Sequence, residues 1–400
     1  MSFFSASKVK VRKKRSLIPA CGACGLHEVC RTDKMPVQGE GKRGILIVGP
    51  GPTDEDDKSG YLYSLHCEGG SYLREAFDQV GIDIDEDCWY TGWQICAGER
   101  PTDKLIEWCQ PNVIKAIRDL NPRLIIPMGF EASKSVLTPY YRDSIGRLDT
   151  WVGWRIPVQK INTWICPTYS PHLIKESERD QKVYDLWLHR HLDAAINMCP
   201  GRPWDTVPDY RSEVQAIYDP EEAAQRIRRM IKRGKPAAFD YETNCLKPNH
   251  AEARIYTCAI TQGKETIAFV VEGEARAALI EFLVSDVPKI GANNKFEDVW
   301  SRQILGVEVN NWAWDTMLSA HHLDNRPNIT SVKFQAFTRL GFEPWDFAIK
   351  GFFQADHSMA LNNIHQCGTA DLLKYNGLDT IIEMEIAKHQ KEEMKWTNCQ

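Results

Sequence analysis

Two runs of alternating strand and helix patterns, separated by a proline-rich segment, constrain the fold of this chain most strongly. In the first run, the apolar segments 43–50 and 122–129 each end at glycine or proline, and a helical pattern over 105–120 lies between them. Buried strands that alternate with helices are typical of a parallel sheet covered by helices. The sequence therefore predicts an α/β fold, in which ligands gather at the carboxyl ends of the strands.

The segment 199–216 is rich in proline and polar residues, and we expect it to be a linker. A helix pattern with an acidic first turn and a glycine stop follows it, and a new strand pattern begins near residue 236. Since 400 residues exceed what one hydrophobic core usually serves, two domains are expected. Their predicted ranges are 18–198 and 217–400, after a flexible basic tail over 1–17.

The composition argues against a polycationic binder of nucleic acid and against a membrane protein. The net charge is −5, so any contact with DNA must use local basic patches such as 226–235. No run of 18 apolar residues is present, and the basic N-terminal segment lacks the apolar core of a signal peptide. Thirteen cysteines without a secretion signal predict a reducing, cytoplasmic location.

Acidic residues of the second half have spacings that suit divalent cations. Asp240 and Glu242 lie two residues apart at the end of a predicted strand, so both carboxylates point to one side. Tyr375 and Asp379 lie on one face of a predicted helix, because they are four residues apart. Acidic residues at helix starts usually only interact favourably with the helix dipole. The combination of these carboxylates with a tyrosine, however, suits hydrolysis of a phosphodiester by two metal ions.

Three short segments, "FDYET", "GANNKFE" and "YNGLD", resemble in this order the motifs of the DEDD 3′–5′ exonuclease superfamily, in its tyrosine-containing branch. The likeness is greatest to the proofreading domain of family A DNA polymerases, and it covers about 236–395. It implies a ribonuclease-H-like α/β domain with two Mg²⁺ or Mn²⁺ ions. By this resemblance Asp240, Glu242 and Asp379 are metal ligands, and Tyr375 orients the attacking water.

The second motif allows two alignments. Asn293, Lys295 and Phe296 fit the family pattern if Glu297 is the metal ligand, whereas the distance to the following glycine selects Asp298. We favour Glu297, although the family has an aspartate there. Both residues are kept as candidates.

The cysteines of the first half include a Cys-x-x-Cys pair, Cys21 and Cys24, and two further candidates, Cys96 and Cys109. The pair by itself fits zinc, a redox dithiol or an iron-sulfur cluster. The other nine are expected to be packing or surface thiols: Cys30, Cys67, Cys88, Cys166, Cys199, Cys245, Cys258, Cys367 and Cys399.

The segments "ILIVGPGPTDEDDKSGYLY", "ICAGERPTDKLIEWC", "NPRLIIPMGFEAS" and "TYSPHL" resemble motifs of family 4 uracil-DNA glycosylases, over about 18–195. The resemblance implies an α/β/α sandwich with a parallel central sheet. It also implies one 4Fe-4S cluster held by Cys21, Cys24, Cys96 and Cys109, with zinc as the alternative.

The residues of the glycosylase pocket differ from that family. Pro50 stands where the family has a glutamate, Gly92 where it has the asparagine that reads uracil, and Ser170 where it has a histidine. Tyr63 replaces a phenylalanine, and His172 lies two residues beyond the catalytic position. Because a glycine cannot hydrogen-bond a flipped base, we expect a degenerate pocket without glycosylase activity that still holds DNA.

The combined expectation is a 3′–5′ DNA exonuclease fused to a glycosylase-like DNA-binding domain. It would act on a free, single-stranded DNA 3′ end during replication or repair. Because the sequence stops shortly after the third exonuclease motif, we expect a separate family A polymerase chain as its partner, as in phage systems, with the host cytoplasm as its location. The alternatives are an active glycosylase with an altered pocket and a non-catalytic DNA-binding or assembly module.

Overall fold

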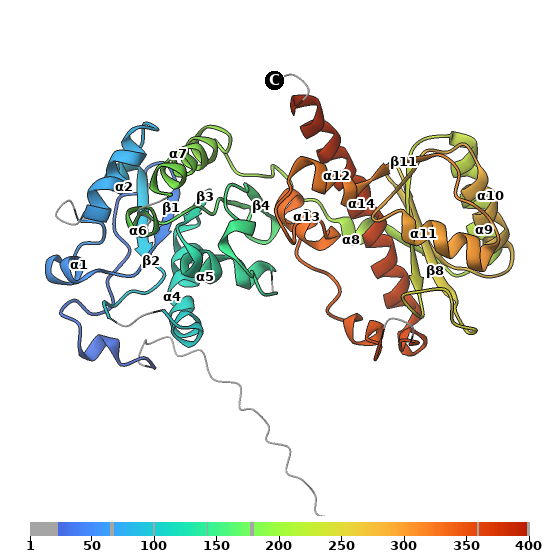
Figure 1. The fold of residues 1–400 in the computed structure, drawn as a ribbon, viewed down its shortest axis with the longest axis horizontal. Coiled ribbons are helices and arrows are strands. Elements are labelled where there is room, and N and C mark those ends of the chain that lie inside the picture. Colours follow the sequence, from blue (N-terminus) through green and yellow to red (C-terminus); the bar gives the residue numbers. More distant parts are fainter. Residues whose placement is uncertain are drawn as a thin grey trace, which may run out of the picture. The chain divides into compact units, whose positions relative to one another are not determined.

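A computed structural model of the protein describes residues 23–64, 68–98, 101–141, 143–176, 180–357 and 360–397. The predicted basic tail over 1–17 lies outside these residues. The chain divides into two compact units (Figure 1). The first contains the residues up to Val136 together with Thr168–Asp193, and the second contains Leu137–Pro167 together with the residues from Ala194 onward. The predicted domain limits stay predictions.

The first unit is built on three parallel strands in the order β2-β1-β3, where β1 is Ile45–Gly49, β2 is Cys88–Gly92 and β3 is Leu124–Pro127. Every residue of β1 is buried, as in a sheet covered on both faces. Helices surround these strands: α1 (Asp54–Ser59), α2 (Glu68–Asp78), α3 (Ile84–Asp87), α4 (Asp103–Leu120), α5 (Phe130–Tyr141), α6 (Pro171–Glu176) and α7 (Gln181–Asn197) (Figure 1). The predicted glycosylase-like α/β architecture is confirmed.

Local sequence explains where these helices begin and end. The hydroxyl of Thr102 accepts a hydrogen bond from the Leu105 N–H at 3.2 Å and so caps α4, which ends at Asn121 in a left-handed conformation. Thr53 and Asp56 form a reciprocal capping box at the start of α1.

Strands β4 (Ile156–Val158) and β5 (Thr163–Ile165) belong to the second unit and form an antiparallel pair. Within the second unit, the segment that carries this pair packs on α13 (Val332–Leu340). The buried ring of Trp151 lies 5.0 Å from the ring of Phe334, and the ring of Tyr141 lies 5.1 Å from that of Phe337.

The second unit contains a mixed sheet in the order β11-β10-β7-β8-β9-β6. Its strands are β6 (Val214–Ile217), β7 (Ala237–Thr243), β8 (Ile255–Gln262), β9 (Glu265–Val270), β10 (Lys289–Gly291) and β11 (Trp312–Asp315). Strands β7, β8 and β9 are antiparallel, and β10 and β11 continue parallel to β7. The hairpin of β8 and β9 turns between Gln262 and Glu265. This arrangement confirms the ribonuclease-H-like fold.

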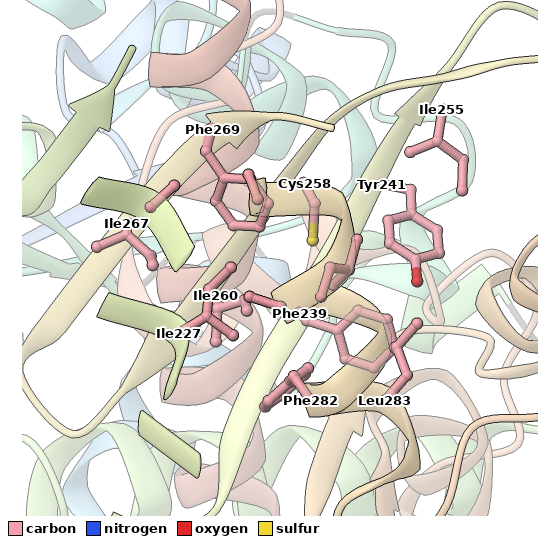
Figure 2. Close-up of a cluster of buried hydrophobic side chains, with 14 of the residues drawn as sticks. Ile227, Phe239, Tyr241, Ile255, Cys258, Ile260, Ile267, Phe269, Phe282 and Leu283 are labelled. Atoms are coloured by element: carbon pink, nitrogen blue, oxygen red, sulfur yellow. The ribbon is translucent and has the colours of Figure 1, made fainter. Parts of the chain in front are cut away.

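The two faces of this sheet differ in side-chain size. On one face, Phe239 and Tyr241 of β7 pack with Ile227 of α9 (Pro220–Arg233) and Phe282 of α10 (Gly273–Val284) (Figure 2). On the other face, small residues such as Ala238 lie under α14 (Thr369–Thr397). Because side chains alternate along a strand, Asp240 and Glu242 share the face that α14 covers.

The remaining helices of the second unit are shorter. They are α8 (Tyr210–Glu213), α11 (Lys295–Trp300), the π-helical turn η4 (Ser301–Leu305) and α12 (Thr316–Leu323). Single 3₁₀ turns in the chain are η1 (Leu26–Glu28), η2 (Leu148–Thr150), η3 (Gln159–Ile161), η5 (Lys350–Phe353) and η6 (Ile364–Gln366). Among the described residues, we find no helix with the length and apolar character needed to cross a bilayer.

Candidate functional site

Three carboxylates meet where β7 passes beneath α14. Asp240 and Glu242 come from the strand, and Asp379 comes from the helix. One oxygen from each of them lies within 4.8 Å of the others. This spacing allows the three side chains to bind one divalent cation, since hard cations prefer carboxylate oxygens.

The two candidates of the second motif point in different directions. Glu297 is 3% exposed and lines the same cavity as Asp240. Asp298 instead accepts a hydrogen bond from Nε of Arg302 at 2.8 Å and another from the Val309 N–H at 3.3 Å. Neighbouring helical residues are about 100° apart around the axis, so only one of the two can face the carboxylate cluster.

The cavity above these carboxylates has a volume of about 360 Å³. Its lining includes Glu297, Tyr375, Glu383 and Lys333. Tyr375 lowers the pKa of the neighbouring Asp379 carboxyl, against the rise caused by burial. The cavity therefore combines acidic groups with a phenol and a cation, which suits a phosphate ester held by metal ions.

Hydrogen bonds from neighbouring side chains hold the carboxylates in place. The amide of Asn376 donates to Oδ2 of Asp240 at 2.8 Å and accepts from the hydroxyl of Thr257 at 3.0 Å. The indole of Trp345 donates to Oδ1 of Asp379 at 3.1 Å. Such supporting contacts fix the orientation of metal ligands.

Burial raises the pKa of Asp240 to about 7. The pKa values of Glu242 and Asp379 are also raised, first by burial and then by the neighbouring carboxylates, while Lys333 opposes the rise in both. The pKa of Glu297 is raised by burial and by Asp240. A bound cation would relieve this repulsion and favour the ionised forms.

Two residues of the cavity were not predicted from the sequence. Glu383 lies one helical turn after Asp379, so the i, i+4 spacing could have indicated it. Lys333 comes from α13, and its ammonium lies 2.5 Å from Oδ2 of Asp346. No local pattern identifies Lys333, because its position depends on how α13 packs.

Some of the cysteines predicted as ligands in the first unit lie close together. Cys21 lies outside the described residues, Cys24 is half-buried, and Cys96 and Cys109 are buried. The pKa of Cys96 is raised to about 12, mainly by burial, and the thiols of Cys30 and Cys109 raise it further. Cys30 is thus a neighbour of Cys96, although the sequence predicts no ligand role for it. Three described thiols therefore share one neighbourhood, a donor set that fits an iron-sulfur cluster or zinc.

The expected glycosylase pocket is narrow around Gly92. A Cβ atom on this glycine would lie 2.5 Å from the carbonyl oxygen of Gln94 and 2.7 Å from that of Pro50. A Cβ atom on Gly49 would lie 1.7 Å from the Tyr63 hydroxyl oxygen. The backbone at Gly92 thus leaves no room for an asparagine side chain.

Ser170 and His172 have separate surroundings. The Ser170 hydroxyl accepts a hydrogen bond from the Leu173 N–H at 3.1 Å, as an N-terminal cap of α6 does. A Cβ atom on Gly129 would lie 3.1 Å from Cβ of Ser170, whereas one on Gly69 would lie 3.1 Å from Cε1 of His172. His172 therefore does not take the place of Ser170.

Comparison with known proteins supports both resemblances. Residues 36–188 match the family model of the uracil DNA glycosylase superfamily. A type-4 uracil-DNA glycosylase of Pyrobaculum aerophilum is 28% identical over 170 residues, which are 40% of this chain and 82% of that protein. The predicted similarity to family 4 glycosylases is confirmed.

A DNA polymerase of Bacillus phage SP01 is 24% identical over 332 residues, which are 73% of this chain. The chain spans only 34% of the length of that polymerase. Since 73% of the chain exceeds either predicted domain, the match includes parts of both. The predicted resemblance to a DNA polymerase is therefore confirmed as a sequence similarity.

Solved structures also match the chain. Escherichia coli RNase D, an exoribonuclease involved in structured RNA processing, is 11% identical with a TM-score of 0.36, and the match covers 46% of each chain.

Proposed function

We propose that the second unit is a 3′–5′ DNA exonuclease that works with two divalent cations. The observation that carries this proposal is the convergence of Asp240, Glu242 and Asp379 within 4.8 Å beneath a cavity that also contains Tyr375. Bound Mg²⁺ or Mn²⁺ would activate a water and stabilise the leaving oxygen of the phosphodiester. Asp240, Glu242, Asp379 and Glu297 would hold these ions.

The other residues of the cavity have distinct roles in this proposal. Tyr375 orients the attacking water with its hydroxyl. Lys333 contributes a positive charge beside the carboxylates, where the scissile phosphate would lie. Asn376 and Trp345 keep Asp240 and Asp379 in position.

The proposed substrate is DNA with a free, single-stranded 3′ end. The names of two similar proteins, a uracil-DNA glycosylase and a phage DNA polymerase, support DNA as the substrate. The similarity to the polymerase also supports a role in proofreading or trimming beside a polymerase, which we propose is a separate family A chain. The proposed location is the cytoplasm, that of the host if a phage encodes the protein.

The first unit is proposed to hold DNA without removing uracil. The close approach of backbone oxygens to Gly92 supports this assignment, since no side chain there can read a base. We further propose that Cys24, Cys96 and Cys109, with Cys21 or Cys30, hold a 4Fe-4S cluster, or zinc in its place. Iron, zinc and sulfide analysis of anaerobically purified protein distinguishes the two.

The exonuclease proposal is tested with a single-stranded oligonucleotide labelled at its 5′ end. With Mg²⁺, we expect progressive shortening from the 3′ end and release of nucleoside monophosphates. Asp240→Ala should slow this degradation by more than about 100-fold, because even residues that only support metal ligands matter by about 10- to 100-fold. Asp298→Asn is the matched control, since its carboxylate pairs with Arg302. Equal rates for wild type and Asp240→Ala would contradict the proposal.

A further inference from the structure

Glu383 is a fifth carboxylate of the exonuclease cavity, and no motif assigns it a role. It is 3% exposed, and it lines the cavity together with Asp240 and Glu297. In the part of the chain that the structure describes, its Oε2 atom is buried without a hydrogen-bond partner. A buried carboxylate oxygen without a partner is costly, so it points to a missing ligand.

Glu297, which lines the same cavity, has the same feature. Its Oε2 atom is also buried and finds no hydrogen-bond partner among the described residues. Glu297 belongs to α11 and Glu383 to α14, so two elements far apart in sequence each supply a cavity-lining glutamate whose Oε2 atom has no hydrogen-bond partner among the described residues.

The charges around Glu383 are acidic. The pKa of Glu383 is raised first by burial and then by Asp240, Glu297, Asp379 and Asp315, in that order. The carboxylate of Asp315 already has hydrogen-bond partners, since it accepts hydrogen bonds from the N–H groups of Asn294 and Met317 at 2.9 Å each. Lys333 is not among the groups that mainly shift the pKa of Glu383. The missing partner is therefore a cation.

Glu297 and Glu383 lie outside the compact carboxylate triad. Asp240, Glu242 and Asp379 bring ligand atoms within 4.8 Å of one another, and neither Glu297 nor Glu383 belongs to that group. Among the charged groups, Asp240 raises the pKa of both Glu297 and Glu383 the most. Asp240 belongs to the triad and also lines the cavity with these two glutamates.

We propose that Glu383 is a direct ligand of the second divalent cation, which it shares with Asp240 and Glu297. This inference rests on the proposed exonuclease function and adds a ligand that the three sequence motifs lack. Three carboxylates from β7, α11 and α14 would supply oxygen ligands for Mg²⁺ or Mn²⁺, and waters would complete the coordination.

The test is a titration of the full chain with Mn²⁺ at pH 8 in the presence of deoxythymidine monophosphate, with free Mn²⁺ measured by electron paramagnetic resonance. We expect the wild type to bind two ions in the second unit. Glu383→Gln should weaken the affinity for one Mn²⁺ ion by about tenfold or more and leave the affinity for the other ion unchanged. Glu383→Asp keeps the charge and should give an intermediate affinity.

Glu385→Gln is the matched control, because this residue lies on the same helix and pairs with Lys388 at the surface. Circular dichroism confirms that each variant is folded. Two sites in Glu383→Gln with affinities within about threefold of the wild type would overturn the inference. If Asp240→Asn also retains both sites, the proposed function fails; if Asp240→Asn loses them, only the role of Glu383 fails.

Discussion

The hydroxyl groups of Tyr241 and Ser301 lie 2.9 Å apart in the interior of the second unit. Tyr241 stands between Asp240 and Glu242 on β7 but points to the opposite face of the sheet, into the cluster of Figure 2. Ser301 begins the π-helical turn that directly follows α11, the helix of Glu297. This hydrogen bond therefore ties the strand of two proposed metal ligands to the helix of another.

Tyr241→Phe should destabilise the second unit by about 1–3 kcal/mol, because it leaves the buried hydroxyl of Ser301 without its partner. Urea unfolding followed by tryptophan fluorescence measures the change. Tyr256→Phe on β8 is the control, since the described residues contain no hydrogen-bond partner for that hydroxyl. Equal losses in the two variants would argue against the Tyr241 contact.

Glu297→Gln should lower the exonuclease rate by about 10- to 100-fold, whereas Asp298→Asn should stay within about twofold of the wild type. The reason is that Glu297 faces the cavity and Asp298 faces Arg302. Single-turnover degradation of a labelled oligonucleotide measures both. The reverse result would favour the alignment that selects Asp298.

Tyr375→Phe should lower kcat by about 100-fold and leave Mn²⁺ affinity nearly unchanged, because the hydroxyl acts on the water and not as a metal ligand. Because Tyr375 also lowers the pKa of Asp379, we expect a small effect of the substitution on Mn²⁺ affinity. Kinetics and Mn²⁺ titration on the same preparation separate the two effects. A large loss of Mn²⁺ binding would assign Tyr375 to the metal site instead.

The raised pKa of Asp240, about 7, predicts a pH dependence of stability. Its unfolded-state pKa is near 3.9, so the contribution to stability is fully present below about pH 4 and is lost as the pH rises through 7. The free energy of unfolding of the metal-free protein should therefore fall between pH 5 and pH 8. The Asp240→Asn variant should show a smaller fall over the same range.

Mg²⁺ should reverse this loss, because metal ligands must be ionised to bind. We expect Mg²⁺ to raise the Tm more at pH 8 than at pH 5.5, as measured by differential scanning fluorimetry. The same rise at both pH values would show that the carboxylate cluster is not the site of binding.

Uracil-containing single-stranded DNA should acquire no abasic sites when incubated with the protein. Gly92→Asn should not create the activity, and it should cost about 1–3 kcal/mol, since its Cβ would lie 2.5 Å from a backbone oxygen. Gly201→Asn is the control, because a Cβ there meets nothing within 4 Å. Alkali-labile sites formed by the wild type would show that the pocket still acts.

Much of the candidate site follows from the sequence because backbone geometry sets local spacing. The period of two along β7 places Asp240 and Glu242 on one face, and the spacing of four on α14 brings Tyr375 beside Asp379. These relationships hold before any long-range contact forms. The sequence therefore determined the two α/β folds and the carboxylate triad.

Only the tertiary structure decided which neighbouring groups complete the site. The direction of Glu297 depends on how α11 packs. Lys333 lines the cavity and Trp345 donates to Asp379, and both come from segments about one hundred residues beyond β7. Cys30 approaches Cys96 in the same way, across many residues of chain. No local period encodes these contacts, because they arise when separate elements bury their apolar faces against one another.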